Sequence, residues 1–163
     1  MFNIIKTKNR SRVYSVINFT FANLIFYIKK DKMKKIRRRI ILTALLLGAL
    51  AIVLSAFGAH LLKPYLTTEQ IAVFETGARY QMYHVFFLFF LSTRKELSIK
   101  TMKLIYDLTI FGILLFSGSL YLLSTNQLTI FDFRIIGFAT PLGGILLIIA
   151  WSYLFFTILR QKS

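Results

Sequence analysis

Hydrophobic residues along this chain form runs that are long enough to cross a lipid bilayer. Three segments contain more than twenty consecutive residues without a charged side chain: Ile40–Leu62, Leu108–Phe131 and Ile135–Leu159. The hydrocarbon core of a bilayer is about 30 Å thick, and a helix needs about 20 apolar residues to span it. No period-two alternation of the kind found in membrane barrels is present. The pattern therefore predicts an all-α membrane protein.

A fourth span is predicted from a less regular segment. Tyr80–Thr93 lacks Lys, Arg and carboxylates but has only 14 residues, and extending it back to Ile71 brings in Glu75 and Arg79. These two are four residues apart with the acid first, which is the favourable order for an ion pair on a helix. We therefore expect one helix over Thr68–Ser92. Its N-cap is expected at Thr67 or Thr68, with a bend at Gly77.

The positions of the basic residues predict the orientation of these spans. The net charge is +15, and twelve of the 21 Lys and Arg residues precede Ile40. A four-transmembrane-helix bundle with spans at about 40–62, 70–93, 104–125 and 135–159 would place 18 basic residues on the cytoplasmic side and three outside. That split satisfies the positive-inside rule with both termini cytoplasmic. Because the basic residues flank apolar runs, we interpret them as topology signals and expect no nucleic-acid partner.

The residue types present argue against several kinds of chemistry. The chain has no cysteine, which excludes disulfides, thiolate metal sites and cysteine nucleophiles. No carboxylate pair or activated nucleophile is apparent, so we expect no enzyme activity. The two histidines, His60 and His84, would differ in depth by roughly 15 Å and could not share one haem iron. We predict no cofactor and no metal site.

The first 32 residues fit the pattern poorly. Val13–Ile28 is 16 residues long and is interrupted by polar side chains. It could be an interfacial segment or a short fifth span, or translation could start at Met33. We divide the chain into an N-terminal extension (1–32), either disordered or a mis-assigned start, and a membrane domain (33–163). A basic cluster followed by an apolar run is also typical of a signal peptide, whose apolar region is 7–15 residues long. Ile40–Leu62 is longer than that, so a span that is retained in the mature protein is predicted.

Small residues predict where the helices pack, because transmembrane helices approach most closely at such positions. They lie at helical spacing in three spans: Ala44, Gly48, Ala51, Ser55 and Ala59 in the first, Gly112, Ser117, Gly118 and Ser119 in the third, and Gly137, Thr140, Gly143 and Gly144 in the fourth. They could form the interior faces of a tight bundle. Trp151 lies on the same side of the last span as Gly137 and Gly144, and Pro141 is expected to kink this span. Alternatively, the segment 141–144 forms a flexible break that lines a ligand site.

Ionisable residues within membrane spans are costly and often functional. Asp107 lies four residues beyond Lys103, with which it can pair. His84 and Gln81 share a helix face with Gly77, and they can either join helices through hydrogen bonds or form a ligand or proton site.

Several short motifs resemble a known family. They are Ala56-Phe57-Gly58-Ala59-His60, Phe74-Glu75-Thr76-Gly77, Tyr80-Gln81-Met82-Tyr83-His84, Leu115-Phe116-Ser117-Gly118-Ser119-Leu120-Tyr121 and Thr140-Pro141-Leu142-Gly143-Gly144, followed by Trp151. In order and spacing they resemble the YgdD/YwdK-type family of small multi-pass bacterial inner-membrane proteins of unknown function. The resemblance implies four spans and a chain that begins just before the first, so residues 1–32 depart from it. The candidate functional or polar interior residues are His60, Glu75, Arg79, Tyr80, Gln81, His84, Ser117, Ser119 and Pro141.

These observations favour a non-enzymatic membrane assembly or interaction protein. Its partners would be the lipid bilayer and either further copies of the chain or another membrane protein. The alternative is a transporter of a small solute or of protons that uses Glu75, Arg79, Gln81 and His84. A water-filled cavity reaching the last two residues would favour transport, and a packed interior would favour the structural role.

Overall fold

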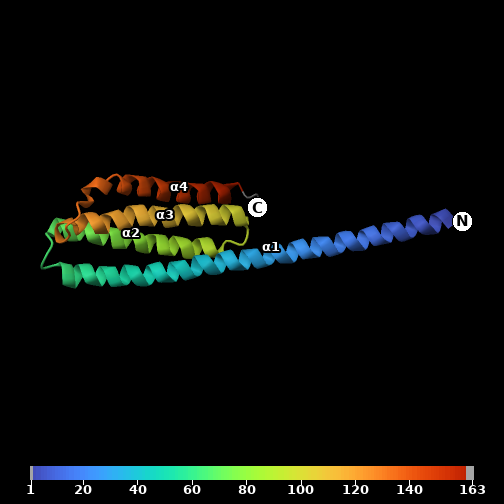
Figure 1. Ribbon diagram of the computed structural model, residues 1–163, viewed down its shortest axis with the longest axis horizontal. Helices are drawn as coiled ribbons and strands as arrows, with labels where there is room; N and C mark the ends of the chain where they lie inside the picture. The colour runs from blue at the N-terminus through green and yellow to red at the C-terminus, as the bar shows by residue number, and fades with distance from the viewer. Residues whose placement is uncertain (1, 161–163) are drawn as a thin grey trace. The chain divides into compact units, whose positions relative to one another are not determined.

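The computed structural model describes residues 2–160, with the side chains of Thr20 and of residues 23–160. The elements in this part of the chain are helices joined by short turns (Figure 1). They are α1 (Phe2–Ala56), the π-helical turn η1 (Phe57–Leu62), α2 (Thr68–Thr93), α3 (Ile99–Ser124), the 3-10 turns η2 (Asn126–Leu128) and η3 (Phe133–Ile136), and α4 (Ala139–Leu159). The predicted all-α class is therefore confirmed for the described residues.

The chain divides into two compact units, Met1–Ile36 and Arg37–Ser163. In the first unit the described backbone is helical, and Lys35 Nζ lies 2.8 Å from Asp31 Oδ2, four residues earlier. Most side chains of Val13–Ile28 lie outside the described residues. The expectation of an interfacial segment there therefore stays a prediction. The expected division at residue 32 stays a prediction.

In the second unit four helices run alternately up and down (Figure 1). α2 packs on α3 and α3 packs on α4. The part of α1 within this unit contacts both α2 and α3: Leu47 C=O accepts a hydrogen bond from α2, and Thr43 Oγ1 lies 3.0 Å from Tyr106 Oη of α3. Near the end of α2, Arg37 Nη2 donates to the carbonyl of Arg94 at 3.1 Å. These contacts join the four helices into one bundle.

Capping residues explain where α2 and α3 begin. The hydroxyl of Thr67 accepts a hydrogen bond from the backbone N–H of Gln70, and the Gln70 side chain accepts one from the Thr67 N–H. This reciprocal arrangement is a capping box, so the predicted N-cap at Thr67 is confirmed. Ser98 likewise caps α3 by accepting from the N–H of Thr101. The helix that contains the third span therefore begins at Ile99 rather than near 104.

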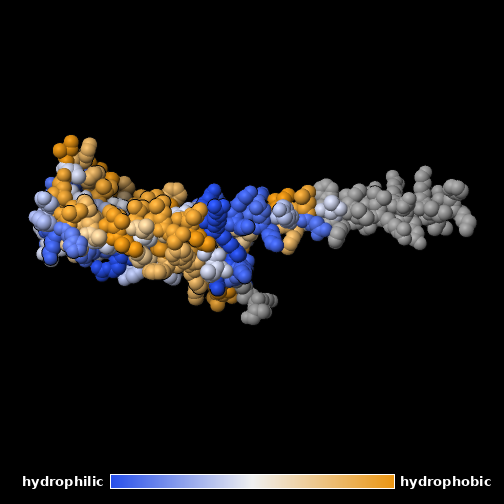
Figure 2. Space-filling view, turned by 90° about the horizontal axis from the view of Figure 1, so that it is seen from below, coloured by the Kyte–Doolittle hydropathy of each residue, from blue (hydrophilic) through white to orange (hydrophobic). Residues whose placement is uncertain are grey.

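The bundle has an apolar surface as well as an apolar interior. Ile40, Leu88, Leu91, Met102 and Ile105 are completely buried. Large hydrophobic side chains also stay exposed on the outer side of every helix of the bundle, and examples are Leu46, Phe86, Leu114 and Ile148. Figure 2 shows that hydrophobic residues predominate along the helices, whereas hydrophilic residues gather toward their ends. Such a surface suits a hydrocarbon environment.

Three segments within the described residues are long and apolar enough to span a membrane: Asn23–Leu62, Ile99–Ser124 and Phe133–Leu159. α2 does not reach the same level of apolarity, because it carries Glu75, Arg79, Gln81 and His84.

The predicted packing of the small-residue faces is confirmed for some positions and wrong for others. Ala44, Gly48 and Ala51 are buried in the bundle as expected, and a Cβ on Gly48 would lie 3.4 Å from the Val85 side chain. The expectation for Gly118 was wrong, since a Cβ there would meet nothing within 4 Å. The contact glycine of α3 is Gly112, six residues earlier and therefore on a different side of the helix.

Two expected breaks in the helices are also corrected. Pro141 is the third residue of α4, in the first turn, where a missing N–H costs no intrahelical hydrogen bond, so the helix runs on through it without the expected break. The interruption comes before it, at the turn between η3 and α4. Gly77 lies inside the continuous helix α2 and is a packing contact: a Cβ there would be 2.9 Å from Tyr121 Cε1.

Candidate functional site

The polar residues of α2 lie on the side of the helix that faces the bundle interior. Gln81 is 4% exposed and His84 is 6% exposed, and Gly77 and Leu88 on the same face are buried too. This confirms the shared face inferred from helical spacing. A buried amide or imidazole must find hydrogen-bond partners, because an unpaired polar group is costly away from water.

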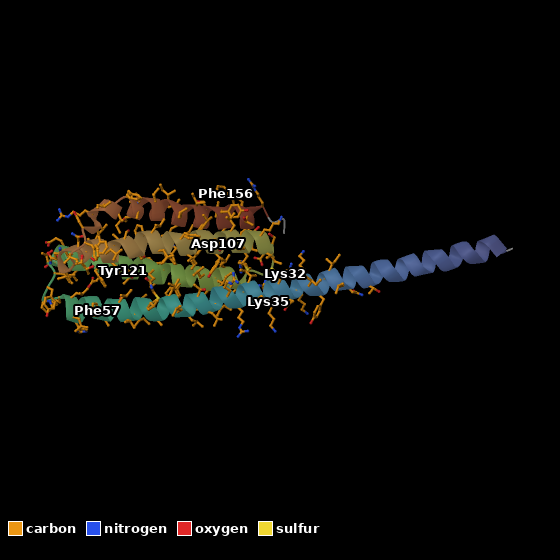
Figure 3. All side chains as sticks on the ribbon, viewed as in Figure 1. Lys32, Lys35, Phe57, Asp107, Tyr121 and Phe156 are labelled. Atoms are coloured by element: carbon orange, nitrogen blue, oxygen red, sulfur yellow. The ribbon has the colours of Figure 1, made fainter. Side chains whose placement is uncertain are left out.

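Gln81 connects three helices. Its Nε2 donates to the carbonyl of Leu47 on α1 at 2.7 Å, and its Oε1 accepts from the hydroxyl of Tyr121 on α3 at 3.0 Å. Tyr121 lies beside α2 in Figure 3. Both polar atoms of the amide are therefore engaged by neighbouring helices.

His84 uses both ring nitrogens. Trp151 Nε1 of α4 lies 3.3 Å from His84 Nε2, and His84 Nδ1 lies 2.7 Å from the carbonyl of Tyr80. An indole N–H can only donate, so Nε2 must be the acceptor and the proton must be on Nδ1, which then donates to Tyr80. The imidazole is thus held as the neutral Nδ1–H tautomer. Phe87 stacks on the same indole, with ring centroids 4.4 Å apart.

Two serines of α3 continue this polar interior. Ser119 Oγ lies 2.7 Å from Thr140 Oγ1 of α4 and also bonds the carbonyl of Phe116. Ser117 is buried, and its hydroxyl has no partner among the described residues. The backbone carbonyl of Ser117 would lie 3.2 Å from a Cβ on Gly77, so α2 and α3 approach closely at this point.

Glu75 and Arg79 lie apart from this interior network, in an open groove of about 510 Å³ between α1 and α2. Arg79 Nη2 is 4.0 Å from Glu75 Oε2, and both side chains are about half exposed. The predicted pair is therefore present at the outer limit of an ion-pair distance. The groove is lined by Ala51, Ile52, Ser55, Ala59, Glu75, Ala78, Arg79, Met82 and Tyr83.

This groove explains a further correction. Ser55 and Ala59 were expected to pack against another helix, but both are exposed and line the groove. Neither Gln81 nor His84 lines it. The structure therefore separates the candidate residues into an interior hydrogen-bonded group and an outward-facing charged pair.

The remaining candidates do not join either group. His60 is exposed in η1, and Pro141 is exposed in the first turn of α4. The side chain of Tyr80 is 41% exposed and packs on Phe116, and only its carbonyl reaches His84. The predicted pair of Lys103 and Asp107 is present.

Sequence reasoning did not identify the partners of the α2 residues. Tyr121 was seen only as part of a motif, and Trp151 only as a residue on the Gly137 and Gly144 side of the last span. They supply the hydroxyl and the indole that bond Gln81 and His84. A signal was available for Tyr121, because it lies four residues after Ser117 and hence on the same helix face. No comparable signal connects Trp151 to His84, which is 67 residues away.

Comparison with known proteins gives consistent matches. The family described as "Protein of unknown function (DUF423)" matches residues 54–144. The UPF0382 membrane protein YwdK of Bacillus subtilis is 41% identical over 113 residues, covering 66% of this chain and 88% of YwdK. A UPF0382 membrane protein of Staphylococcus epidermidis is 37% identical over 120 residues, covering 71% of this chain and 94% of the relative.

A more distant relative extends the match. The UPF0382 inner membrane protein YgdD of Escherichia coli is 30% identical over 128 residues, covering 77% of this chain and 92% of YgdD. No solved structure matches. The matches cover most of the chain and confirm the resemblance seen in its motifs. The relatives are named as membrane proteins, which agrees with the apolar surface of the bundle. The chain therefore belongs to the DUF423 family of membrane proteins of unknown function.

Proposed function

We propose that this protein is a four-span membrane protein with a non-enzymatic role, in which a fixed helical bundle binds lipids or other membrane proteins. One observation carries the proposal: the polar atoms of Gln81 and His84 are all engaged in hydrogen bonds within the bundle, and most of these bonds join helices. Interhelical hydrogen bonds of this kind hold transmembrane helices together. The interior polar residues therefore act in assembly of the bundle.

The crossing of the membrane by α2 is part of the proposal. At 1.5 Å per residue its 26 residues extend about 39 Å, which exceeds the hydrocarbon thickness. Its outward side exposes Val73, Tyr83, Phe86 and Phe90. Since Gln81 and His84 point inward and Glu75 and Arg79 can pair with each other, a low overall hydropathy is compatible with lipid around α2.

The distribution of basic residues supports cytoplasmic termini. Figure 1 shows the α2–α3 loop and the end of α4 at the same end of the bundle. Between residues 37 and 160, eight Lys and Arg residues belong to that end: Arg37, Arg38, Arg39, Arg94, Lys95, Lys100, Lys103 and Arg160. Lys63, Arg79 and Arg134 belong to the other end. Such an excess identifies the cytoplasmic side of a membrane protein.

Reporter fusions test this topology. Reporters placed after Lys100 and after Ser163 should both report the cytoplasm. An external location for both reporters together with a cytoplasmic N-terminus would show that α2 does not cross, because two spans, α3 and α4, separate the reporters, and the proposal would then be wrong.

Transport of a small solute or of protons is the alternative. It would require Gln81 and His84 to exchange their helix partners for a moving ligand. Purified protein in vesicles loaded with a pH-sensitive dye separates the two roles. We expect a pH gradient to decay equally fast with the unchanged chain and with His84→Phe. Faster decay that His84→Phe abolishes would establish proton transport instead.

A further inference from the structure

The groove between α1 and α2 is not used by the interior hydrogen-bond network. Four of its lining residues have small side chains, and we call them its floor: Ala51, Ser55 and Ala59, at steps of four residues, and Ala78 from α2. The larger apolar side chains of Ile52, Met82 and Tyr83 also line it. Ala51 and Ala78 are almost completely buried. The volume of about 510 Å³ is in the range of about 300–1,000 Å³ typical of small-molecule sites.

Two opposite charges lie at the side of this apolar floor. Arg79 and Glu75 are about half exposed, with 4.0 Å between Nη2 and Oε2. A guanidinium has five N–H donors and a carboxylate has about four acceptor positions, so one loose contact leaves most of this capacity unused. Charged groups that face lipid need polar partners.

The pair lies in the N-terminal half of α2, from which long side chains reach toward the lipid headgroups. Glu75 and Arg79 are seven and eleven residues from the start of the helix, which is about 10 and 16 Å along its axis. Side chains tilt toward the helix N-terminus, and the long arginine side chain extends in that direction. Both charges therefore lie toward the end of α2 away from the basic residues.

We infer that this groove binds one phospholipid with a primary ammonium headgroup. The lipid phosphate contacts Arg79, the ammonium group donates to Glu75, and an acyl chain lies along the floor formed by Ala51, Ser55 and Ala78. The opposite signs of the two protein charges match the two charges of such a headgroup, and the small apolar side chains match the chain. This inference depends on the proposed crossing of α2, which the reporter fusions test separately.

Native mass spectrometry of the full chain in detergent tests the inference. The probes are dioleoyl phosphatidylethanolamine, phosphatidylcholine and phosphatidylglycerol, added separately. We expect phosphatidylethanolamine to bind about tenfold more tightly than phosphatidylglycerol, the factor that one charge-assisted hydrogen bond provides. Equal affinities of the unchanged chain for the three lipids would overturn the inference.

Charge variants assign the headgroup contacts. Glu75→Gln should remove the preference for phosphatidylethanolamine over phosphatidylglycerol, and Arg79→Gln should weaken the binding of all three lipids. The matched control is Asp107→Asn, because Asp107 also belongs to a half-exposed pair of residues four apart but does not line the groove. It should leave binding unchanged. A preference that survives Glu75→Gln would contradict the proposed contact.

A steric variant tests the floor. Ser55→Leu should fill the groove and reduce phosphatidylethanolamine binding, whereas Ala49→Leu, at an exposed α1 position outside the groove, should not. Thermal unfolding of each variant shows whether it is folded. A lipid-free dimer that Ser55→Leu converts to a monomer would show that a second copy occupies the groove, and the lipid site would be wrong. If the unchanged chain shows no preference for phosphatidylethanolamine while both reporter fusions report the cytoplasm, the lipid site is wrong but the proposed crossing of α2 stands.

Discussion

Gly143 provides the most direct test of the packing between α3 and α4. A Cβ at this position would lie 2.3 Å from Phe116 N, 2.8 Å from Leu115 C and 2.9 Å from Gly112 O. All three atoms belong to the backbone, so no side chain can rotate to make room. Gly143→Ala therefore forces the two helices apart by about 1 Å, the shortfall from ordinary van der Waals contact.

The neighbouring glycine supplies a matched control. A Cβ on Gly144 would lie 3.6 Å from Phe116 Cδ2, which is an ordinary contact, and one on Gly118 would meet nothing within 4 Å. At both positions alanine should be neutral or stabilising by up to about 1 kcal/mol, because glycine is the poorer helix former. Gly143→Ala gains the same propensity but adds overpacking, which typically costs about 1–3 kcal/mol. We expect a net loss of up to about 2 kcal/mol for Gly143→Ala.

Thermal unfolding in one detergent, followed by circular dichroism, compares the three variants with the unchanged chain. The midpoint should fall for Gly143→Ala and stay level or rise for Gly144→Ala and Gly118→Ala. A Gly143→Ala midpoint equal to that of Gly144→Ala would refute the close approach of α3 and α4.

Three further results are expected. Gln81→Leu should lower stability by about 1–3 kcal/mol because it leaves the Tyr121 hydroxyl without an acceptor. Combined with Tyr121→Phe it should cost less than the sum of the two single changes, and additive values from thermal unfolding would show that the hydrogen bond does not form. Glu75→Gln together with Arg79→Gln should be better tolerated than either change alone, with a coupling below about 1 kcal/mol because the pair is half exposed. A chain beginning at Met33 should insert and fold like the full chain, and failed insertion in a membrane fractionation assay would contradict this.

Local properties account for the features that were predictable from the sequence. The apolar runs identify the membrane environment because spanning length depends only on composition and helical rise. Thr67 and Gln70 predict the start of α2 because a capping box is formed within four residues. The inward side of α2 followed from helical spacing, which places Gly77, Gln81 and His84 on one face.

Other features depend on how one helix is rotated against the next, and local pattern does not contain that information. Gly118 and Gly143 look alike in sequence, yet the first faces open space and the second touches the backbone of α3. Ser55 continues the small-residue series of Ala51, yet it lines a groove rather than a helix contact.

The sequence by itself determined that this is an all-helical membrane protein of the DUF423 family, because apolar length, caps and motifs are local properties of the chain. Only the tertiary structure decided which groups the polar residues bond. The bond between His84 and Trp151 joins residues 67 positions apart, and the bond between Gln81 and Tyr121 joins residues 40 apart. Packing brings these partners together, and the same packing leaves Glu75 and Arg79 facing outward, because the positions of the helices relative to one another determine which polar groups meet.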